Sequence, residues 1–407
     1  MGKSIHFTGQ PIFNQLLFLI PRSTINRLVR YHRGDRYTKK FKTYDHLVTM
    51  LFSVFHRCTS LREVITGMQA GSSRLHHLGV LNSPRRSTLA DANRRRPVGF
   101  FEDLYHELYK YHYNFLPDSL KGKKAFERLF IIDSTTITLF SEALLGAGNY
   151  KYNGKKKGGI KAHLLIRAKD DIPCFVRLTE GKQGDQRFLP FIHLPQRSIV
   201  VMDRGYRNYS QLIKWTQQRV TWITRPNVRT VYKIIQKNTV SKEHKTSGIR
   251  KDCLVDLGNY LTKHINPLQK ARLVTFYDKE SKNLYDFITN DFRSSPITIA
   301  DLYKKRWQIE ILFKRIKQNF YLHEFLGDNE NAVRIQLWCT LIADLLLKIV
   351  KDKTDKKRKW SMSNLAGLVR LHLSTYINLY AFLSNPEKAL INYKDPTAQQ
   401  QLKLFIT

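Results

Sequence analysis

The sequence is poor in cysteine, and its cysteines do not have the spacing of a metal-binding or disulfide motif. Its 407 residues include four cysteines, at positions 58, 174, 253 and 339, and no two of them form a CxxC pair. This scattering argues against a zinc finger or a disulfide framework, and it is typical of reduced thiols. We therefore expect a cytoplasmic protein.

Long hydrophobic runs are also missing. The most apolar windows are Leu16–Ile20, which Pro21 stops, and Leu341–Val350, which Asp344 and Lys348 interrupt. Neither approaches the roughly 20 apolar residues that span a bilayer. The N-terminus has no apolar core of a signal peptide. The sequence thus predicts a protein that does not associate with a membrane.

Acidic residues are few relative to basic ones. The chain has 33 Asp and Glu against 69 Lys and Arg, a formal net charge of +36. Such a charge attracts polyanions and opposes compaction unless a counter-charge binds. Because 42% of the residues are hydrophobic, the chain can still form cores, and general disorder is excluded. Ribosomal proteins are usually shorter, so the expected partner is DNA or RNA handled by a larger protein.

The first 120 residues indicate a helical domain, which we predict to bind DNA. Ser60 followed by Glu63 is a capping box that opens one helix. A second helix, Thr88–Arg95, ends before Pro97 and is basic at its C-terminal end. Three arginines there are predicted DNA contacts: Arg94, Arg95 and Arg96. The alternative is a solvated helix end, where cations interact favourably with the helix dipole.

A mixed α/β sheet is expected after residue 120. Runs rich in β-branched residues predict strands, and a continuously apolar run predicts a buried strand. One strand is expected around Asp133, in which Leu129–Ile132 and Ile137–Phe140 flank this residue. Further strands are expected at Ile160–Ile166, Phe175–Leu178, Ser198–Met202 and Val220–Thr224, with a helix at Tyr209–Gln217. Residues 226–290 alternate short apolar stretches with Lys-rich turns and predict a β-rich insertion. We therefore expect an α/β domain over 121–350 and a helical C-terminal region over 351–407.

Two aspartates stand where predicted strands are interrupted or end. Asp133 follows Leu-Phe-Ile-Ile, and Asp203 follows Ser-Ile-Val-Val-Met. A buried carboxylate is costly unless it is paired or binds a cation. Ligands of open α/β sheets collect at the carboxyl ends of strands, so the two side chains are expected to converge. Taken singly, each Asp is more typical of turn or cap chemistry.

One long helix, about Thr298–Asn319, is predicted to carry a third acid. Positions 303, 306, 310, 314 and 317 fall within one sector of such a helix at about 100° per residue. That face carries Tyr303, Arg306, Glu310, Lys314 and Lys317, with apolar residues on the opposite side. Trp307 lies at its edge, where it could stack on an extruded base or pack against the β-rich insertion. An ordinary amphipathic helix is the alternative.

These motifs resemble those of bacterial insertion-sequence DDE transposases. The Y-(2)-R-(3)-E-(6)-K signature of that group is matched by Tyr303, Arg306, Glu310 and Lys317. Asp133-Ser134-Thr135 resembles the first acidic motif, and Asp203-Arg204-Gly205-Tyr206 resembles the second. Residues 285–290 resemble the strand that leads into the glutamate helix. The resemblance covers roughly residues 125–350, with the motifs in the correct order.

The resemblance implies an RNase H-like mixed sheet core with a β-rich insertion, preceded by a helical DNA-binding domain. It also implies that Asp133, Asp203 and Glu310 are the catalytic, metal-binding residues, and that Tyr303, Arg306 and Lys317 hold phosphates. A basic stretch, residues 150–161, is predicted to contact phosphates or to be a mobile hairpin tip. Its candidates are Lys155, Lys156 and Lys157. His163 and Asp185 are candidates for residues that support the acids.

Three carboxylates suit two ions of Mg²⁺ or Mn²⁺, which prefer oxygen ligands. The implied function is cut-and-paste transposition in the nucleoid of a bacterial cytoplasm. A homodimer would bind the terminal inverted repeats, cleave double-stranded DNA and transfer the cut strand to a target. Two alternatives stay open: a metal-dependent nuclease without strand transfer, and a non-catalytic DNA-binding protein. A zinc peptidase is excluded, because His106-Glu107 is followed by His112 and not by a His at position 110.

Overall fold

The computed structural model describes residues 9–71, 76–80, 83–113, 125–138, 149–152, 155–181, 183–206, 208–227, 229–258, 269–320, 325–354 and 358–391. The chain divides into two compact units. The helical unit combines Met1–Asn114 with Lys314–Thr407, and the sheet unit is Phe115–Phe313. Across the described ranges, no helix has both the length and the apolar character needed to cross a membrane.

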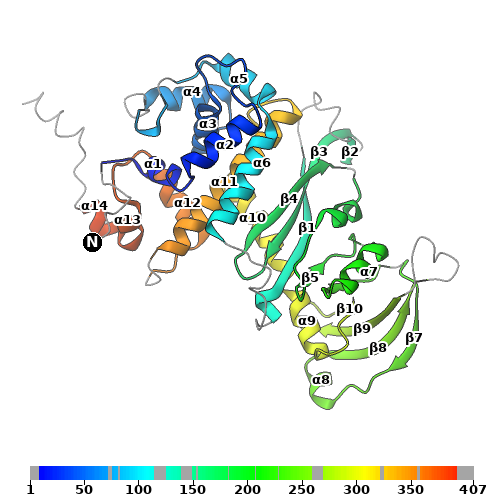
Figure 1. Cartoon of the computed structure of the whole chain (residues 1–407). Helices are drawn as coiled ribbons and strands as arrows, with labels where there is room; N and C mark the ends of the chain where they lie inside the picture. Colours follow the sequence, from blue (N-terminus) through cyan, green and yellow to red (C-terminus); the bar gives the residue numbers. More distant parts are fainter. Residues whose placement is uncertain are drawn as a thin grey trace, which may run out of the picture. The chain divides into compact units, whose positions relative to one another are not determined.

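The helical unit is organised around one buried helix. α11 (Glu330–Lys353) packs against α3 (Thr43–His56), α5 (Arg86–Arg95), α6 (Val98–His112) and α12 (Met362–Leu371) (Figure 1). It contains the apolar run that begins at residue 341. Asp344 within that run is buried and pairs with the guanidinium of Arg315 at 3.0 Å. The pairing allows a carboxylate to stand in an apolar core. Other helices of this unit are α1 (Ile12–Leu17), α2 (Arg22–Tyr31), α4 (Leu61–Ala70), α13 (Leu379–Ser384) and α14 (Pro386–Ile391).

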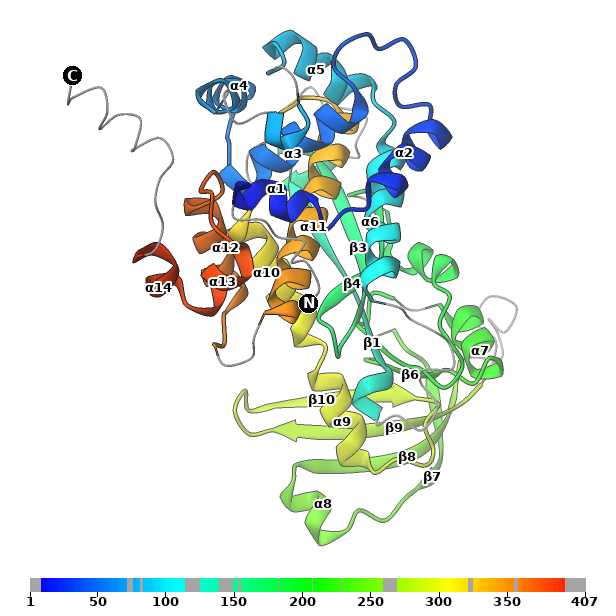
Figure 2. The same ribbon diagram turned by 60° about the vertical axis from the view of Figure 1, so that its left-hand side comes forward.

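Segments from near the two ends of the chain lie side by side in this unit, as α1 and α13 do in Figure 2. The backbone amide of Ile12 donates to the carbonyl of Thr375 at 3.0 Å. The side chain of Gln15 donates to the carbonyl of Ile377 at 2.6 Å and accepts from the amide of Leu379 at 2.8 Å. These long-range bonds explain why the N-terminal and C-terminal segments form one unit. The structure therefore groups residues 314–350, which the sequence placed in the α/β domain, with the helices.

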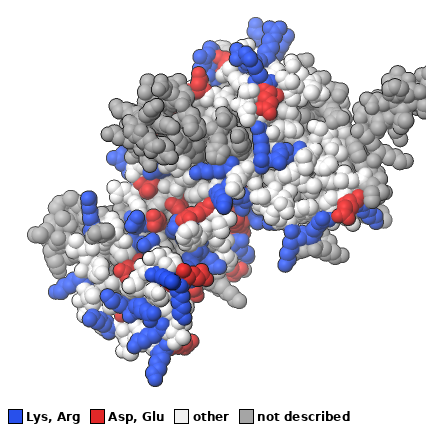
Figure 3. Space-filling model, turned by 180° about the vertical axis from the view of Figure 1, so that it is seen from behind, with Lys and Arg blue, Asp and Glu red and all other residues white. Residues whose placement is uncertain are grey.

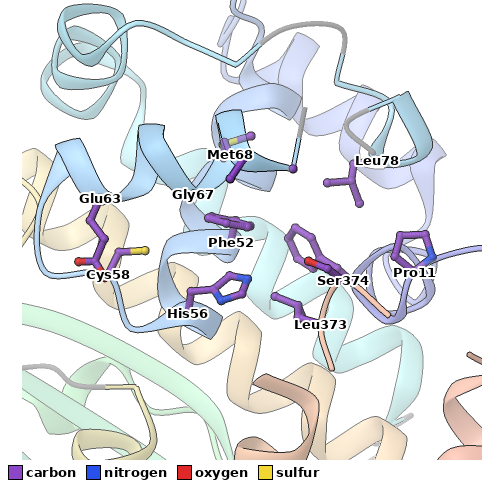
Figure 4. A pocket seen from close by; sticks show the side chains of 13 residues that line it. Pro11, Phe52, His56, Cys58, Glu63, Gly67, Met68, Leu78, Leu373 and Ser374 are labelled. Carbon is purple, nitrogen blue, oxygen red and sulfur yellow. The ribbon is translucent and has the colours of Figure 1, made fainter. Parts of the chain in front are cut away.

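The contact between α3 and α4 is close at a glycine. Ser60 accepts a hydrogen bond from the amide of Glu63 and so caps α4, as the capping box predicted. A Cβ atom at Gly67 would lie 3.1 Å from the ring of Phe52, which is closer than side chains normally pack. Beside this contact, a cavity of about 360 Å³ opens between α3, α4 and residues 373–374, and its walls are mostly apolar (Figure 4).

Arg96 has a structural role, and our prediction that it contacts DNA is wrong. It lies just after α5 and is only 5% exposed. Its guanidinium donates to the carbonyls of Gly34 and Phe41 and to Thr43 Oγ1 at 2.9 Å, and it pairs with an Asp35 oxygen at 3.2 Å. It therefore ties the segment after α2 to the end of α5. The other two predicted arginines are exposed and pair with Asp91.

The described residues of the sheet unit contain a single mixed sheet of ten strands. β1 pairs antiparallel with β3 and parallel with β5, and β5 pairs parallel with β6. The sheet continues from β6 through β10, β9 and β8 to β7, while β2 and β4 pair with β3. The strands are β1 (Leu129–Thr138), β2 (Asn149–Tyr152), β3 (Lys155–Arg167), β4 (Ile172–Glu180), β5 (Ile199–Met202), β6 (Thr221–Thr224), β7 (Tyr232–Lys237), β8 (Ile249–Leu257), β9 (Gln269–Asp278) and β10 (Asn283–Thr289).

This sheet confirms the mixed α/β class and the RNase H-like order of the core strands. It is accompanied by the short helices η3 (Ala125–Arg128) and η5 (Asp185–Phe191), by α7 (Tyr209–Gln217) and α8 (Lys242–Thr246), and by α9 (Pro296–Lys304). The second half of the predicted strand Ile137–Phe140 lies outside the described residues. The β-rich segment 226–290 extends the core sheet, because β10 pairs with β6. One apolar cluster contains Trp222 of β6 together with Leu273 of β9, so these strands share a core.

The role of Arg96 predicts a loss of stability. We expect Arg96→Ala to lower the free energy of unfolding by about 2–3 kcal/mol, because buried carbonyls and Asp35 lose their donor. Arg95→Ala, which removes an exposed neighbour, is the matched control and is expected to change stability by less than about 0.5 kcal/mol. Chemical denaturation measures both variants. Equal stability of the two variants would contradict the structural role of Arg96.

Candidate active site

Two parallel strands bring the two aspartates together. β1 and β5 pair in register, with Ile132 opposite Met202. Asp133 and Asp203 are the next residues on each chain segment, so both stand at the same level of neighbouring strands. Asp203 comes directly after β5, where the chain turns, whereas β1 continues to Thr138. The register therefore places the two positions side by side, as the strand pattern predicted.

The third acid is carried by the second of two helices, and our prediction of one continuous helix is wrong. α9 ends at Lys304, and α10 (Trp307–Asn319) begins three residues later. In the turn between them, the amides of Lys305 and Arg306 donate to carbonyls three residues earlier. Such tighter bonding replaces the α-helical pattern. The sequence has no Pro or Gly here from which a helix break could be predicted.

Arg306 lies in this turn and joins two of the acids. Its guanidinium donates to Asp133 Oδ2 at 2.8 Å and to Glu310 Oε1 at 2.6 Å. The side chains of Arg306 and Asp133 are 12% and 17% exposed, and that of Glu310 is 38% exposed. Tyr303 donates its hydroxyl to Asp203 Oδ1 at 3.5 Å. One guanidinium and one phenol therefore contact all three carboxylates.

The surroundings of Asp133 disfavour the ionised form of its carboxyl group. The pKa of Asp133 is raised to about 6, chiefly by burial and to a smaller extent by Asp203 and Glu310, while the amide of Ser134 and the guanidinium of Arg306 act in the opposite direction. Burial also raises the pKa of Tyr303, to which the charge of Asp203 adds. The phenol therefore keeps its proton and remains a donor to Asp203. Acids with so little solvent around them require a positive partner.

The donor set fits a divalent metal. Carboxylate oxygens are the ligands that Mg²⁺ and Mn²⁺ prefer. Within the part of the chain that the structure describes, no three Asp, Glu, His or Cys side chains are placed to share one ion. The guanidinium of Arg306 contacts both Asp133 and Glu310, so it meets the need for positive charge that a metal would otherwise meet. A cation bound by Asp133 and Glu310 together would have to replace it.

His163 and Asp185 support the first acidic motif through Ser134. Ser134 Oγ donates to Asp185 Oδ1 at 2.9 Å, and Lys161 Nζ donates to the same oxygen at 3.2 Å. His163 Nδ1 lies 3.7 Å from this oxygen. Burial lowers the pKa of His163 to about 4, so its ring is neutral at pH 7. A Cβ atom at Gly205 would lie 2.9 Å from Asp185 Oδ2, so a larger residue there would have to displace this carboxylate. Ser134 belongs to the first acidic motif and Lys161 to the basic stretch of residues 150–161, but the sequence did not predict that both contact Asp185.

Three of the remaining predicted residues belong to α10: Trp307, Lys314 and Lys317. Trp307 is 60% exposed, and its ring lies 5.8 Å from the Arg306 guanidinium. Lys314 is exposed on α10, and Lys317 is half-buried there, with its pKa lowered by burial. The side chains of three further candidates lie outside the described residues, although their backbone forms part of β3: Lys155, Lys156 and Lys157. Their roles as DNA contacts stay predictions.

Comparisons with known proteins agree with this geometry. A family model described as a transposase DDE domain matches residues 124–346, more than half of the chain. A domain of unknown function (DUF4372) matches residues 8–81. A putative transposase y4zB of Sinorhizobium fredii is 30% identical over 268 residues, which cover 66% of this chain and 72% of that protein. A probable transposase for insertion sequence element IS5377 of Geobacillus stearothermophilus is 30% identical over 58% of this chain and 60% of that protein.

Among solved structures, the chain is similar to the cryo-EM structure of the piggyBac transposase synaptic complex with hairpin DNA. The TM-score is 0.45 at 12% identity, and the match covers 92% of this chain and 81% of that chain.

The sheet, its acids and the family match define a DDE polynucleotidyl transferase, a class of enzymes that acts on DNA with divalent metal ions. The chain belongs to the transposase DDE family, and it is a transposase of the insertion-sequence kind.

The position of Arg306 predicts competition with metal. In metal-free buffer, we expect Arg306→Gln to lower the melting temperature, because Asp133 and Glu310 lose their counter-charge. We also expect the variant to bind Mn²⁺ on the order of tenfold more tightly than the wild type, since the ion displaces no guanidinium. Electron paramagnetic resonance of free Mn²⁺ measures the affinity. Lys305→Gln, at the exposed neighbouring position, is the matched control. Unchanged or weaker Mn²⁺ binding by Arg306→Gln would show that the guanidinium does not compete.

Proposed function

We propose that this chain moves an insertion sequence by cut-and-paste transposition, with Asp133, Asp203 and Glu310 as its metal-binding catalytic acids. The observation that carries the proposal is the acid cluster itself. The register of β1 and β5 puts Asp133 beside Asp203, and Arg306 joins Asp133 to Glu310. Two Mg²⁺ or Mn²⁺ ions, when bound, activate the attacking water or 3′-hydroxyl and stabilise the leaving oxygen.

The neighbouring side chains have tasks that follow from their contacts. Tyr303 keeps its proton and donates to Asp203, so it orients that carboxylate. Arg306 neutralises Asp133 and Glu310, and once released it presents two N–H groups that suit a phosphate of the transposon end. Lys317 lies two turns after Glu310 on α10 and supplies a point charge for another phosphate.

We propose double-stranded DNA as the substrate, both at the terminal inverted repeats and at the target, and a homodimer as the synaptic form. Lys and Arg outnumber Asp and Glu over the face in Figure 3, and they gather over the part that contains β7, β8 and α8. Exposed basic residues there are Lys233, Lys237, Lys245, Arg250 and Lys251. Such a surface neutralises phosphates without reading their sequence. The working location of such a protein is the bacterial nucleoid.

The assignment of the acids predicts separate effects on cutting and on binding. We expect Asp133→Asn, Asp203→Asn and Glu310→Gln each to slow cleavage by more than about 100-fold, the upper range for losing an outer-shell partner of a metal ligand. Binding of the element's own ends in EDTA should be retained, because removing an acid does not weaken attraction to phosphates. Cleavage in Mg²⁺ and gel-shift binding measure the two effects. Glu243→Gln, at an exposed acid on α8, is the control. A variant of the three that still cuts at nearly the wild-type rate is not a metal ligand.

A second prediction separates a transposase from a simple nuclease. A transposase must hold the cut end until its 3′-hydroxyl attacks the target, and Lys317 is the proposed anchor. We expect Lys317→Ala to reduce joined product about tenfold while nicking changes little. Arg306→Ala should reduce both, because Arg306 also contacts two of the acids. A gel that resolves nicked, double-cut or hairpin, and joined products measures each step, with Lys304→Ala on exposed α9 as control. Wild-type protein that nicks its ends but never joins them is a nuclease.

A further inference from the structure

The sheet unit has a second concave surface, which contains none of the three acids. It is a groove of about 700 Å³ between β4, η5 and the beginning of α7. The side chains that matter for its chemistry are Arg177 and Thr179 of β4, Arg187 and Phe191 of η5, and Asn208 before α7. Its volume lies within the range of sites that enclose a small ligand.

The groove is built to attract an anion. Two arginines line it, and no acidic side chain does so among the described residues. Asn208 caps α7, with its side chain accepting from the amide of Gln211. The positive end of the helix dipole therefore faces the groove and adds to the two guanidinium groups.

The groove also presents a flat apolar surface to solvent. Phe191 is 43% exposed, although it stands at the rim of a polar groove. The guanidinium of Arg177 lies 3.5 Å from the centre of its ring, so the two groups form a stacked pair. Guanidinium planes and aromatic rings are the surfaces on which unpaired bases stack. An anion site beside a stacking surface matches the phosphate and the base of one nucleotide.

One wall of the groove is connected to the acids. His163 lines the groove, is 1% exposed and lies 3.7 Å from Asp185. Asp185 accepts from Ser134, the residue that follows Asp133. His163 also bonds through Nδ1 to the hydroxyl of Tyr206, three residues after Asp203, at 3.3 Å. The groove is thus linked to the acid cluster by the contacts of His163 with Asp185 and Tyr206.

We propose that this groove holds a single strand of DNA that continues from the cleavage point, with a phosphate on Arg177 and Arg187 and an unpaired base on Phe191. The proposal rests on the proposed function, because it takes DNA as the substrate of the acid cluster. A base inside a duplex offers its faces only to its neighbours in the stack, so the interior of a duplex cannot use Phe191. The strand is therefore unpaired at this place.

The test measures how much a single-stranded tail adds to DNA affinity. The probes are fluorescein-labelled duplexes of about 20 base pairs, blunt or with about five thymidines at the 3′ or the 5′ end, in EDTA. We expect one tail to raise wild-type affinity about tenfold, the gain expected from stacking one base. Phe191→Ala should remove most of this gain, and Phe191→Trp should keep it. Arg187→Ala should reduce the gain and lower the tail-dependent salt slope by about 0.7.

Arg250→Ala is the matched control for charge, since Arg250 is exposed on β8 and does not line the groove. It should weaken blunt and tailed duplexes equally and leave the gain unchanged. The proposal is overturned if neither tail adds affinity to the wild type, or if Phe191→Ala and Arg187→Ala keep the full gain. Should Phe191→Ala fail to fold, the gain in affinity from the tail is compared between the wild type, Phe191→Trp and Arg187→Ala. If the proposal for the groove fails, the assignment of the acids still stands, because it is tested separately by the cleavage rates of the acid variants.

Discussion

The site depends on the repulsion between carboxylates that are held close together in little solvent. Asp133 and Asp203 stand side by side because β1 and β5 are parallel and in register. Burial and, to a smaller extent, the neighbouring acids raise the pKa of Asp133 to about 6, so a nearby cation favours its charged form. Arg306 supplies that cation and brings Glu310 to the same place.

The position of Arg306 follows from how the chain returns to the sheet. Glu310 follows Asp203 by 107 positions, the chain between them contains β6–β10, and β10 ends beside β6. Asn290, just after β10, accepts from the amide of Trp222 at 2.8 Å and donates to the carbonyl of Val220 at 3.0 Å. These bonds fix the point at which the chain leaves the sheet for α9. The β-rich segment is therefore more than a basic surface, because its pairing with β6 positions the helices that carry Tyr303 and Glu310.

The excess of basic residues does not act uniformly. Two arginines bind partners inside the helical unit. Arg96 binds backbone carbonyls and Asp35, and Arg315 pairs with Asp344. Arg306 is held by two acids, whereas Arg187 stands exposed at the rim of a groove without acids. Net charge predicts that the protein binds a polyanion, and burial decides which cations are free to do so.

The sequence by itself determined the class of fold and the candidate acids. Apolar β-branched runs followed by Asp predict strands that carry a carboxylate within them, as at Asp133, or directly after them, as at Asp203, and this information is local. The signature around Glu310 is local in the same way. The grouping of residues 314–350 with the N-terminal helices was not available from the sequence, since it rests on contacts between segments hundreds of residues apart, such as Gln15 with Ile377.

The tertiary structure alone decided what the cations do. The periodicity of residues 298–319 is that of one helix, whereas the structure has a break at Lys305 and Arg306. At this break Arg306 donates to Asp133, which is 173 residues away in the chain. Arg96 looks like a surface residue at a basic helix end, yet it is buried by its bonds to the segment that follows α2. Local patterns determine helices, strands and candidate acids. The partner of a long charged side chain is determined by segments that only folding brings near.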